Sequence, residues 1–152
     1  FILEKWRSNH RYAVNAAHFI EDVHGWFRAN FREIGDSVGV FDDERLARGG
    51  SVDLTPAVLD RFRSTLKSLE GHHQGEDRSW FPSLRRAHPG SNAAFDILEA
   101  DHKCLHPLES VVFNTKLPMQ VRAQALREFI VFLEDHLRRE EMIVVPIMLK
   151  QR

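Results

Sequence analysis

The sequence predicts an all-α protein folded as an antiparallel up-down four-helix bundle. Apolar residues recur at helical spacing over four long segments, and no segment shows the alternation expected of a strand. Most joints between these segments are short, which favours antiparallel neighbours. With 152 residues, 43% of them hydrophobic, the chain has the size of one ordinary domain, so we expect residues 1–152 to form a single domain.

The first predicted helix is followed by an unusually long connection. We expect the helix to run from Leu3 to about Ile34, and His10 and His24 share its apolar stripe. The segment 35–54 then mixes glycines and acids without periodicity. A connection of that length is uncommon inside a compact domain, so it predicts a short turn of its own structure or a flap, and a lid over a site is one hypothesis.

The other three helices have clearer boundaries. Thr55 followed by Pro56 is typical of a helix start, because threonine caps the free amides and proline fits the first turn. Pro107 removes a backbone donor in the third helix and is expected to bend it. The expected ranges are about 56–86, about 93–113, and from Pro118 onward.

One motif occurs twice, as HHQGEDRSWFP at 72–82 and as HLRREEMIVVP at 136–146. Each copy reads His, three residues, Glu, a second acid, four residues, Pro. On a helix, positions i and i+4 lie one above the other, so each copy directs an imidazole and a carboxylate to one place. The pairs His72/Glu76 and His136/Glu140 therefore each provide half of a metal site.

The two glutamates lie on apolar stripes, where an unpaired carboxylate costs several kcal/mol. No Lys or Arg shares those stripes, but His24 and His102 occupy the stripes of the two remaining helices. One inward histidine is more often a hydrogen-bonded core residue than a ligand. The whole set is different, because nitrogen and carboxylate donors converging inside a bundle suit Fe, Mn or Zn, and bridging carboxylates favour a pair of metals.

Composition and charge exclude several classes of partner. A formal charge of −1 gives no basic field for nucleic acid or an anionic membrane, so we expect a small-molecule partner and leave the oligomeric state open. The first residues are too charged for a signal peptide, and the longest apolar run, 142–149, is too short to span a bilayer. Cys104 is the single cysteine, which is typical of a reducing cytoplasm and of a buried thiol.

The chain resembles hemerythrin-like proteins of the HHE cation-binding class. The resemblance is carried by HGWFRANF at 24–31, EADHKCLHPLES at 99–110 and the two repeated segments. It implies a four-helix bundle around a non-heme diiron centre, in which two iron ions share Glu76, Glu140 and an oxo or hydroxo bridge. The terminal ligands that it implies are His24, His72, His102 and His136.

His106 completes this predicted ligand set. It follows His102 by four residues, and oxygen-carrying hemerythrins are similar in having two histidines at that spacing. With His106, five histidines and two carboxylates leave about one open position across two six-coordinate ions, which suits reversible binding of one small molecule. Without it a second position opens and oxygen or peroxide activation becomes easier. Pro107 argues against His106, because a residue before proline disfavours helical geometry.

The remaining polar and aromatic residues near these stripes are expected at the surface, beside the ligands or in the apolar core. His18 and His88 are expected at the surface, and His73 is expected beside the ligands, because only His72 places Glu76 at i+4. Some neighbouring acids can accept a hydrogen bond from a ligand imidazole, although most such acids are solvated. These acids are Glu21, Asp77, Asp101 and Glu141, and the aromatic residues expected in the core are Trp26, Trp80 and Phe81.

A ferritin-like diiron site is a competing interpretation, because it uses Glu-x-x-His on two helices. The pairs Glu21/His24, Glu70/His73 and Glu99/His102 have that spacing, but the fourth helix has none. We therefore predict a carrier or sensor that binds dioxygen, nitric oxide or peroxide. A diiron oxidoreductase acting on dioxygen or peroxide is the alternative, while iron storage and a metal-free structural bundle are less well supported.

Overall fold

The structure is a computed structural model that describes residues 15–150, all of whose regular elements are helical. The expected helical turns between Leu3 and Val14, with His10, lie outside the described residues. The prediction of an all-helical bundle is confirmed over the described range. The elements are η1 (His18–His24), α3 (Gly25–Val38), α4 (Asp43–Ala47), α5 (Pro56–Gly75), η2 (Glu76–Trp80), α6 (Phe81–Ala87), η3 (Pro89–Ser91), α7 (Asn92–Phe113) and α8 (Met119–Lys150).

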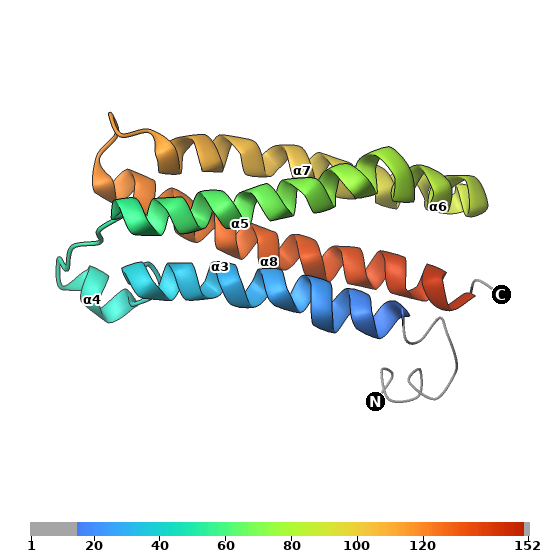
Figure 1. Ribbon diagram of the computed structural model, residues 1–152, viewed down its shortest axis with the longest axis horizontal. Helices are drawn as coiled ribbons and strands as arrows, with labels where there is room; N and C mark the ends of the chain where they lie inside the picture. Colours follow the sequence, from blue (N-terminus) through green and yellow to red (C-terminus); the bar gives the residue numbers. More distant parts are fainter. Residues whose placement is uncertain (1–14, 151–152) are drawn as a thin grey trace.

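Four long rods make up the molecule (Figure 1). The first is η1 with α3, the second is α5 with η2 and α6, and α7 and α8 are the third and fourth. In Figure 1 the chain follows α3 from right to left, returns through α5 and α6, and repeats this course through α7 and α8. Helix α7 continues through Pro107, and α8 continues through Pro146.

The first long helix ends later than its composition predicts. Helix α3 continues to Val38, and Gly39 ends it in the left-handed conformation at φ 77°, which glycine adopts without steric cost. Gly35 is therefore not a helix breaker. A Cβ at this position would lie 2.6 Å from the Phe41 ring and 2.8 Å from the Ile130 side chain. The glycine instead allows the segment after α3 and helix α8 to approach the α3 backbone closely.

The connection between α3 and α5 contains the short helix α4, which fits the prediction that it carries structure of its own. Asp42 caps α4 by accepting a hydrogen bond from the Arg45 amide at 3.1 Å. Val40 and Val52 border a cavity with Ala123, near the start of α8. Because His136 lies thirteen residues beyond Ala123, roughly 20 Å along a helix, the connection does not cover the predicted metal ligands.

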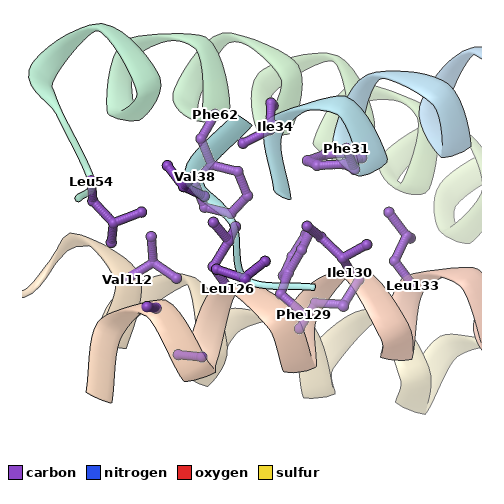
Figure 2. Close-up of a cluster of buried hydrophobic side chains, with 14 of the residues drawn as sticks. Phe31, Ile34, Val38, Leu54, Phe62, Val112, Leu126, Phe129, Ile130 and Leu133 are labelled. Carbon is purple, nitrogen blue, oxygen red and sulfur yellow. The ribbon is translucent and has the colours of Figure 1, made fainter. Parts of the chain in front are cut away.

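The larger apolar core lies between α3, α5 and α8 (Figure 2). Phe31, Phe62 and Phe129 meet there with ring centroids 5.2 to 5.9 Å apart, a favourable separation for aromatic pairs. A second, smaller apolar cluster is formed at the other end of the rods by residues that include Phe19, Phe81, Phe95, Leu98 and Val144. Thr55 caps α5 as predicted, through a 3.2 Å hydrogen bond from the Val58 amide.

Two side chains predicted to be buried are exposed. Cys104 lies on the outer face of α7, because the buried stripe of that helix passes through His102 and Leu105 instead. Trp26 is also exposed, whereas Phe81 is fully buried as predicted. Among the described residues, no helix combines the length and apolar character needed to cross a membrane.

Candidate metal centre

A layer of buried polar side chains separates the two apolar clusters. On each of the four rods, the buried residues change from one apolar cluster to the other across this layer, as from Leu98 through His102 to Leu105 on α7. Six members are at most 8% exposed, and the His72 side chain is 18% exposed. We call this set the polar layer; it contains His24, His72, His73, Glu76, His102, His136 and Glu140.

Two short π-helical segments flank the polar layer. His24 ends η1 and Glu76 begins η2. In both segments the next buried residue is five positions away, from Phe19 to His24 and from Glu76 to Phe81, instead of three or four. An i→i+5 turn absorbs the extra residue, and such bulges are frequent at functional sites. The sequence analysis did not predict them, although the five-residue gap between inward positions was a usable signal.

The tautomer of His24 is set by a pair of charged groups behind it. Its Nδ1 lies 2.8 Å from Glu141 Oε2, and the Arg28 guanidinium donates to the same carboxylate. A carboxylate accepts, so Nδ1 carries the proton and Nε2 presents a lone pair. That Nε2 is buried without a hydrogen-bond partner, 3.7 Å from Glu140 Oε1. The predicted ligand atom is therefore free for a cation.

His102 and His136 are oriented in the same way. His102 Nδ1 lies 2.9 Å from Asp77 Oδ1, and His136 Nδ1 lies 3.0 Å from Asp101 Oδ2. Arg139 donates two hydrogen bonds to Asp101 at 2.9 and 3.0 Å. The two Nε2 atoms lie 3.2 Å apart, so in the tautomers that keep both protons on Nδ1 their lone pairs face one another. A cation shared by the two nitrogens would replace this repulsion with two bonds.

The two glutamates bring buried carboxylates together. All four oxygens of Glu76 and Glu140 are buried and have no hydrogen-bond donor among the described residues. Burial, with the neighbouring Glu140 charge, raises the pKa of Glu76 well above its ordinary value. Burial opposes the ionisation of Glu140 as well, but its contacts with Glu76 and His136 hold its pKa below the ordinary value. Burial and mutual repulsion thus oppose the ionisation of both acids together, and nearby cations would favour it.

Glu140 also connects two groups of histidines. Its Oε1 faces His24, whereas its Oε2 lies 3.2 Å from His136 Nε2. Glu76 Oε1 lies 2.7 Å from His72 Nε2, but these atoms are not oriented for a hydrogen bond. This arrangement of oxygens suits carboxylates that bind cations on either side.

His73, which the sequence analysis expected beside the ligands, lies within the polar layer. Successive helical residues are turned by about 100°, so His72 faces His24 while His73 faces His102. The His73 ring stacks on His102 with centroids 3.7 Å apart, and its Nε2 is buried without a partner. Burial lowers the pKa of both α5 histidines, that of His72 to about 4, so both remain neutral donors at neutral pH.

The structure places His106 outside the polar layer, contrary to the prediction. Its side chain is 61% exposed, and its nearest charged neighbour is Glu109, with Nδ1 and Oε2 3.4 Å apart. The buried stripe of α7 follows a seven-residue repeat through Leu98, Leu105 and Val112. A step of four residues from His102 therefore moves to the edge of the stripe, and Leu105 takes the inward place.

The donor atoms form three groups that could hold a metal ion. Within each group, one nitrogen or oxygen per residue lies within 4.8 Å of the others. Five imidazoles and two carboxylates in a water-excluded layer, with unpartnered donor atoms, have the chemistry of a transition-metal centre. The residues present fit a pair of ions. The groups are His24, His72 and Glu140; His73, His102 and His136; and Glu76, His102 and Glu140.

The acids of the ferritin-like alternative do not join these groups. Glu21 and Glu70 are exposed, and Glu99 pairs with Arg85 at 3.2 Å. By contrast, three acids next to the repeated motif or to His102 accept from polar-layer imidazoles, more than the expectation that most of these acids are solvated; they are Asp77, Asp101 and Glu141. The polar layer therefore follows the His-x3-Glu pattern.

Aromatic rings border the centre. Phe19 packs on His24 with centroids 4.0 Å apart, and Phe27 lies 5.4 Å from His72. Trp80 contacts Phe19 edge-on at 5.1 Å, so it belongs to this apolar wall. Aromatic rings thus line the His24 and His72 side of the polar layer.

The fold and site define a helical bundle with a histidine and carboxylate metal centre in its core. Comparison by sequence agrees, because residues 2–148 match the family described as the hemerythrin HHE cation binding domain. The chain belongs to this family. No curated protein and no solved structure matches it.

Proposed function

We propose that the protein holds two iron ions in an up-down antiparallel bundle and binds dioxygen or a related small ligand reversibly. The observation that carries this proposal is a set of seven buried polar-layer atoms that have no hydrogen-bond partner within residues 15–150. They are Nε2 of His24, His72 and His73 and the four carboxylate oxygens of Glu76 and Glu140. Buried polar atoms normally have partners, so this concentration of unpartnered donor atoms supports a site for cations.

The ligand assignment follows the groups described above. His24 and His72 would hold one ion, His73, His102 and His136 the other, and both glutamates would bridge them. His73 thereby takes the place that the sequence analysis gave to His106. The ligand count is unchanged at five histidines and two carboxylates, so about one open position remains, on the ion with two histidines.

The surroundings of that position support a carrier or sensor. A bound pair of iron ions supplies an open coordination position and the electrons that dioxygen binding requires. Phe19 packs on the fully buried His24 and Phe27 packs beside His72, and such apolar neighbours limit proton delivery to a bound ligand. Asp77, Asp101 and Glu141 hold three ligand imidazoles in the tautomer that presents Nε2.

The proposal is tested by anaerobic loading with Fe²⁺, metal quantitation, and optical spectra recorded on exposure to oxygen and after purging with argon. We expect two irons per chain and a charge-transfer band that appears with oxygen and disappears on purging. Irreversible oxidation with turnover of peroxide or a reductant would assign the oxidoreductase function instead. Absence of stoichiometric iron would contradict the proposal.

A matched pair of variants controls for general damage. His18 and His24 both lie in η1, but His18 is exposed and its Nδ1 pairs with Asp22. His24→Ala is expected to lose one iron and the oxygen-dependent band, whereas His18→Ala is expected to keep both.

A further inference from the structure

A cavity of about 120 Å³ lies between α5 and α7, beside the polar layer. His73 and His102 belong both to its lining and to the polar layer. Glu70, Gln74 and His106 are exposed residues of the same lining. The cavity therefore extends from the surface to two proposed iron ligands. Two other cavities, near α4 and between α7 and α8, are lined by no polar-layer residue.

The charge of this cavity is negative. Its described lining includes three carboxylates, Glu70, Asp77 and Glu109, and no lysine or arginine. Glu70 belongs to α5 and Glu109 to α7, so both walls of the cavity contribute an acid. A cleft lined by one sign of charge concentrates ions of the opposite sign and speeds their arrival. This cavity attracts cations and repels anions.

The inner end of the cavity offers a stronger ligand than its mouth. His73 is 8% exposed, and its Nε2 has no hydrogen-bond partner among the described residues. The mouth offers carboxylate oxygens, whereas the inner end offers imidazole nitrogen, which binds Fe²⁺ more readily than an oxygen donor alone. A cation that enters between the acids thus meets better donors further in.

The donor atoms at the mouth suit a cation better than a gas. An ion that gives up bound water must replace it with protein ligands, and carboxylate oxygens at the mouth serve that exchange. An apolar gas would need no such groups.

We infer that this cavity is the port through which Fe²⁺ reaches the polar layer, and that Glu70 and Glu109 form a transient cation site at its mouth. The inference rests on the proposed function. It assigns a role to two acids that neither bind the proposed iron pair nor orient its ligands.

The test measures the rate of Fe²⁺ uptake by the full metal-free chain under anaerobic conditions and low salt. Samples are desalted at intervals and their bound iron is quantified. The Glu70→Gln/Glu109→Gln double variant is expected to take up iron at least about tenfold more slowly than the wild type and to reach the same final stoichiometry. The Glu128→Gln variant removes an exposed acid on α8 and should match the wild type.

A second variant tests the same charge with both acids left in place, at Gln74, whose side chain donates to Glu70 at 3.3 Å. Gln74→Lys places a cation on the exposed rim and should also slow uptake, with a smaller effect at high salt. Wild-type uptake rates in both variants would overturn the port. A slower response of the iron-loaded variants to dioxygen, with unchanged iron uptake, would overturn it in favour of a gas channel. Failure of the wild type to bind stoichiometric iron would overturn the proposed function as well.

Discussion

The apolar core around Phe129 and the polar layer around Glu140 are built on the same helices by different chemistry. In the apolar core, Phe31, Phe62 and Phe129 bury their rings against one another and need no ligand (Figure 2). Eleven residues further along α8, Glu140 is equally buried and both of its oxygens lack partners. The apolar core needs no ligand, whereas the polar layer contains unpartnered donor atoms that could hold metal ions.

Stability and function therefore depend on different regions of one bundle, the apolar clusters and the polar layer. Apolar burial supplies free energy of folding at about 25 cal/mol per Å². The polar layer forgoes that gain and adds the cost of buried charge, which the apolar clusters on both sides must offset. The free-energy cost of buried charge is thus confined to the polar layer, where metal would bind, as expected of a functional site.

The largest effect is expected in the apolar core. Phe129→Ala removes the ring shared by two aromatic contacts and leaves a cavity, so it should lower the free energy of unfolding by about 3–5 kcal/mol. Chemical denaturation with and without iron measures this loss. A similar loss in both states is expected; a loss confined to the iron-loaded state would contradict the separation of the two regions.

In the polar layer, removing buried charge should raise the free energy of unfolding instead of lowering it. Glu76→Met/Glu140→Met replaces two buried acids with apolar side chains of similar volume, so the metal-free chain should gain about 1–3 kcal/mol while losing iron binding. Denaturation of the metal-free proteins gives the value. Leu133→Met, one layer away on α8, is the control and should change stability by less than about 1.5 kcal/mol. Destabilisation of the double variant by several kcal/mol would mean that the carboxylates are satisfied without cations.

A smaller effect is expected from the acids behind the histidines. Asp101→Asn removes the charge that orients His136 and pairs with Arg139, so iron affinity should fall about 10- to 100-fold. Competition with a chelator of known affinity measures it. Asp135→Asn, an exposed neighbour on α8, should leave affinity unchanged. Equal affinities for Asp101→Asn and the wild type would remove its positioning role.

Much of the fold could be predicted from sequence, because each helix carries one long stripe. Thr55 marked the start of α5, and the stripe placed His24, Glu76, His102, His136 and Glu140 inside. The acids that contact the proposed ligand imidazoles could also be found from the sequence, because each is adjacent in sequence to a proposed ligand. These inferences needed only helical periodicity.

The errors arose where periodicity alone does not fix a direction. The i+4 rule placed His106 below His102, but the seven-residue repeat of α7 turns that position outward. His73 was assigned a secondary place because one face was assumed for α5, whereas this helix faces both His24 and His102. Gly35 resembled a helix breaker because close packing against Phe41 cannot be seen in a local pattern.

The most direct measurement compares iron stoichiometry in His73→Ala and His106→Ala at equilibrium. Both variants remove one imidazole, but only the His73 ring stacks against His102 within the polar layer. We predict that His73→Ala loses iron from the three-histidine group, while His106→Ala binds two irons per chain like the wild type. Loss of iron in His106→Ala with full binding in His73→Ala would contradict the proposed centre.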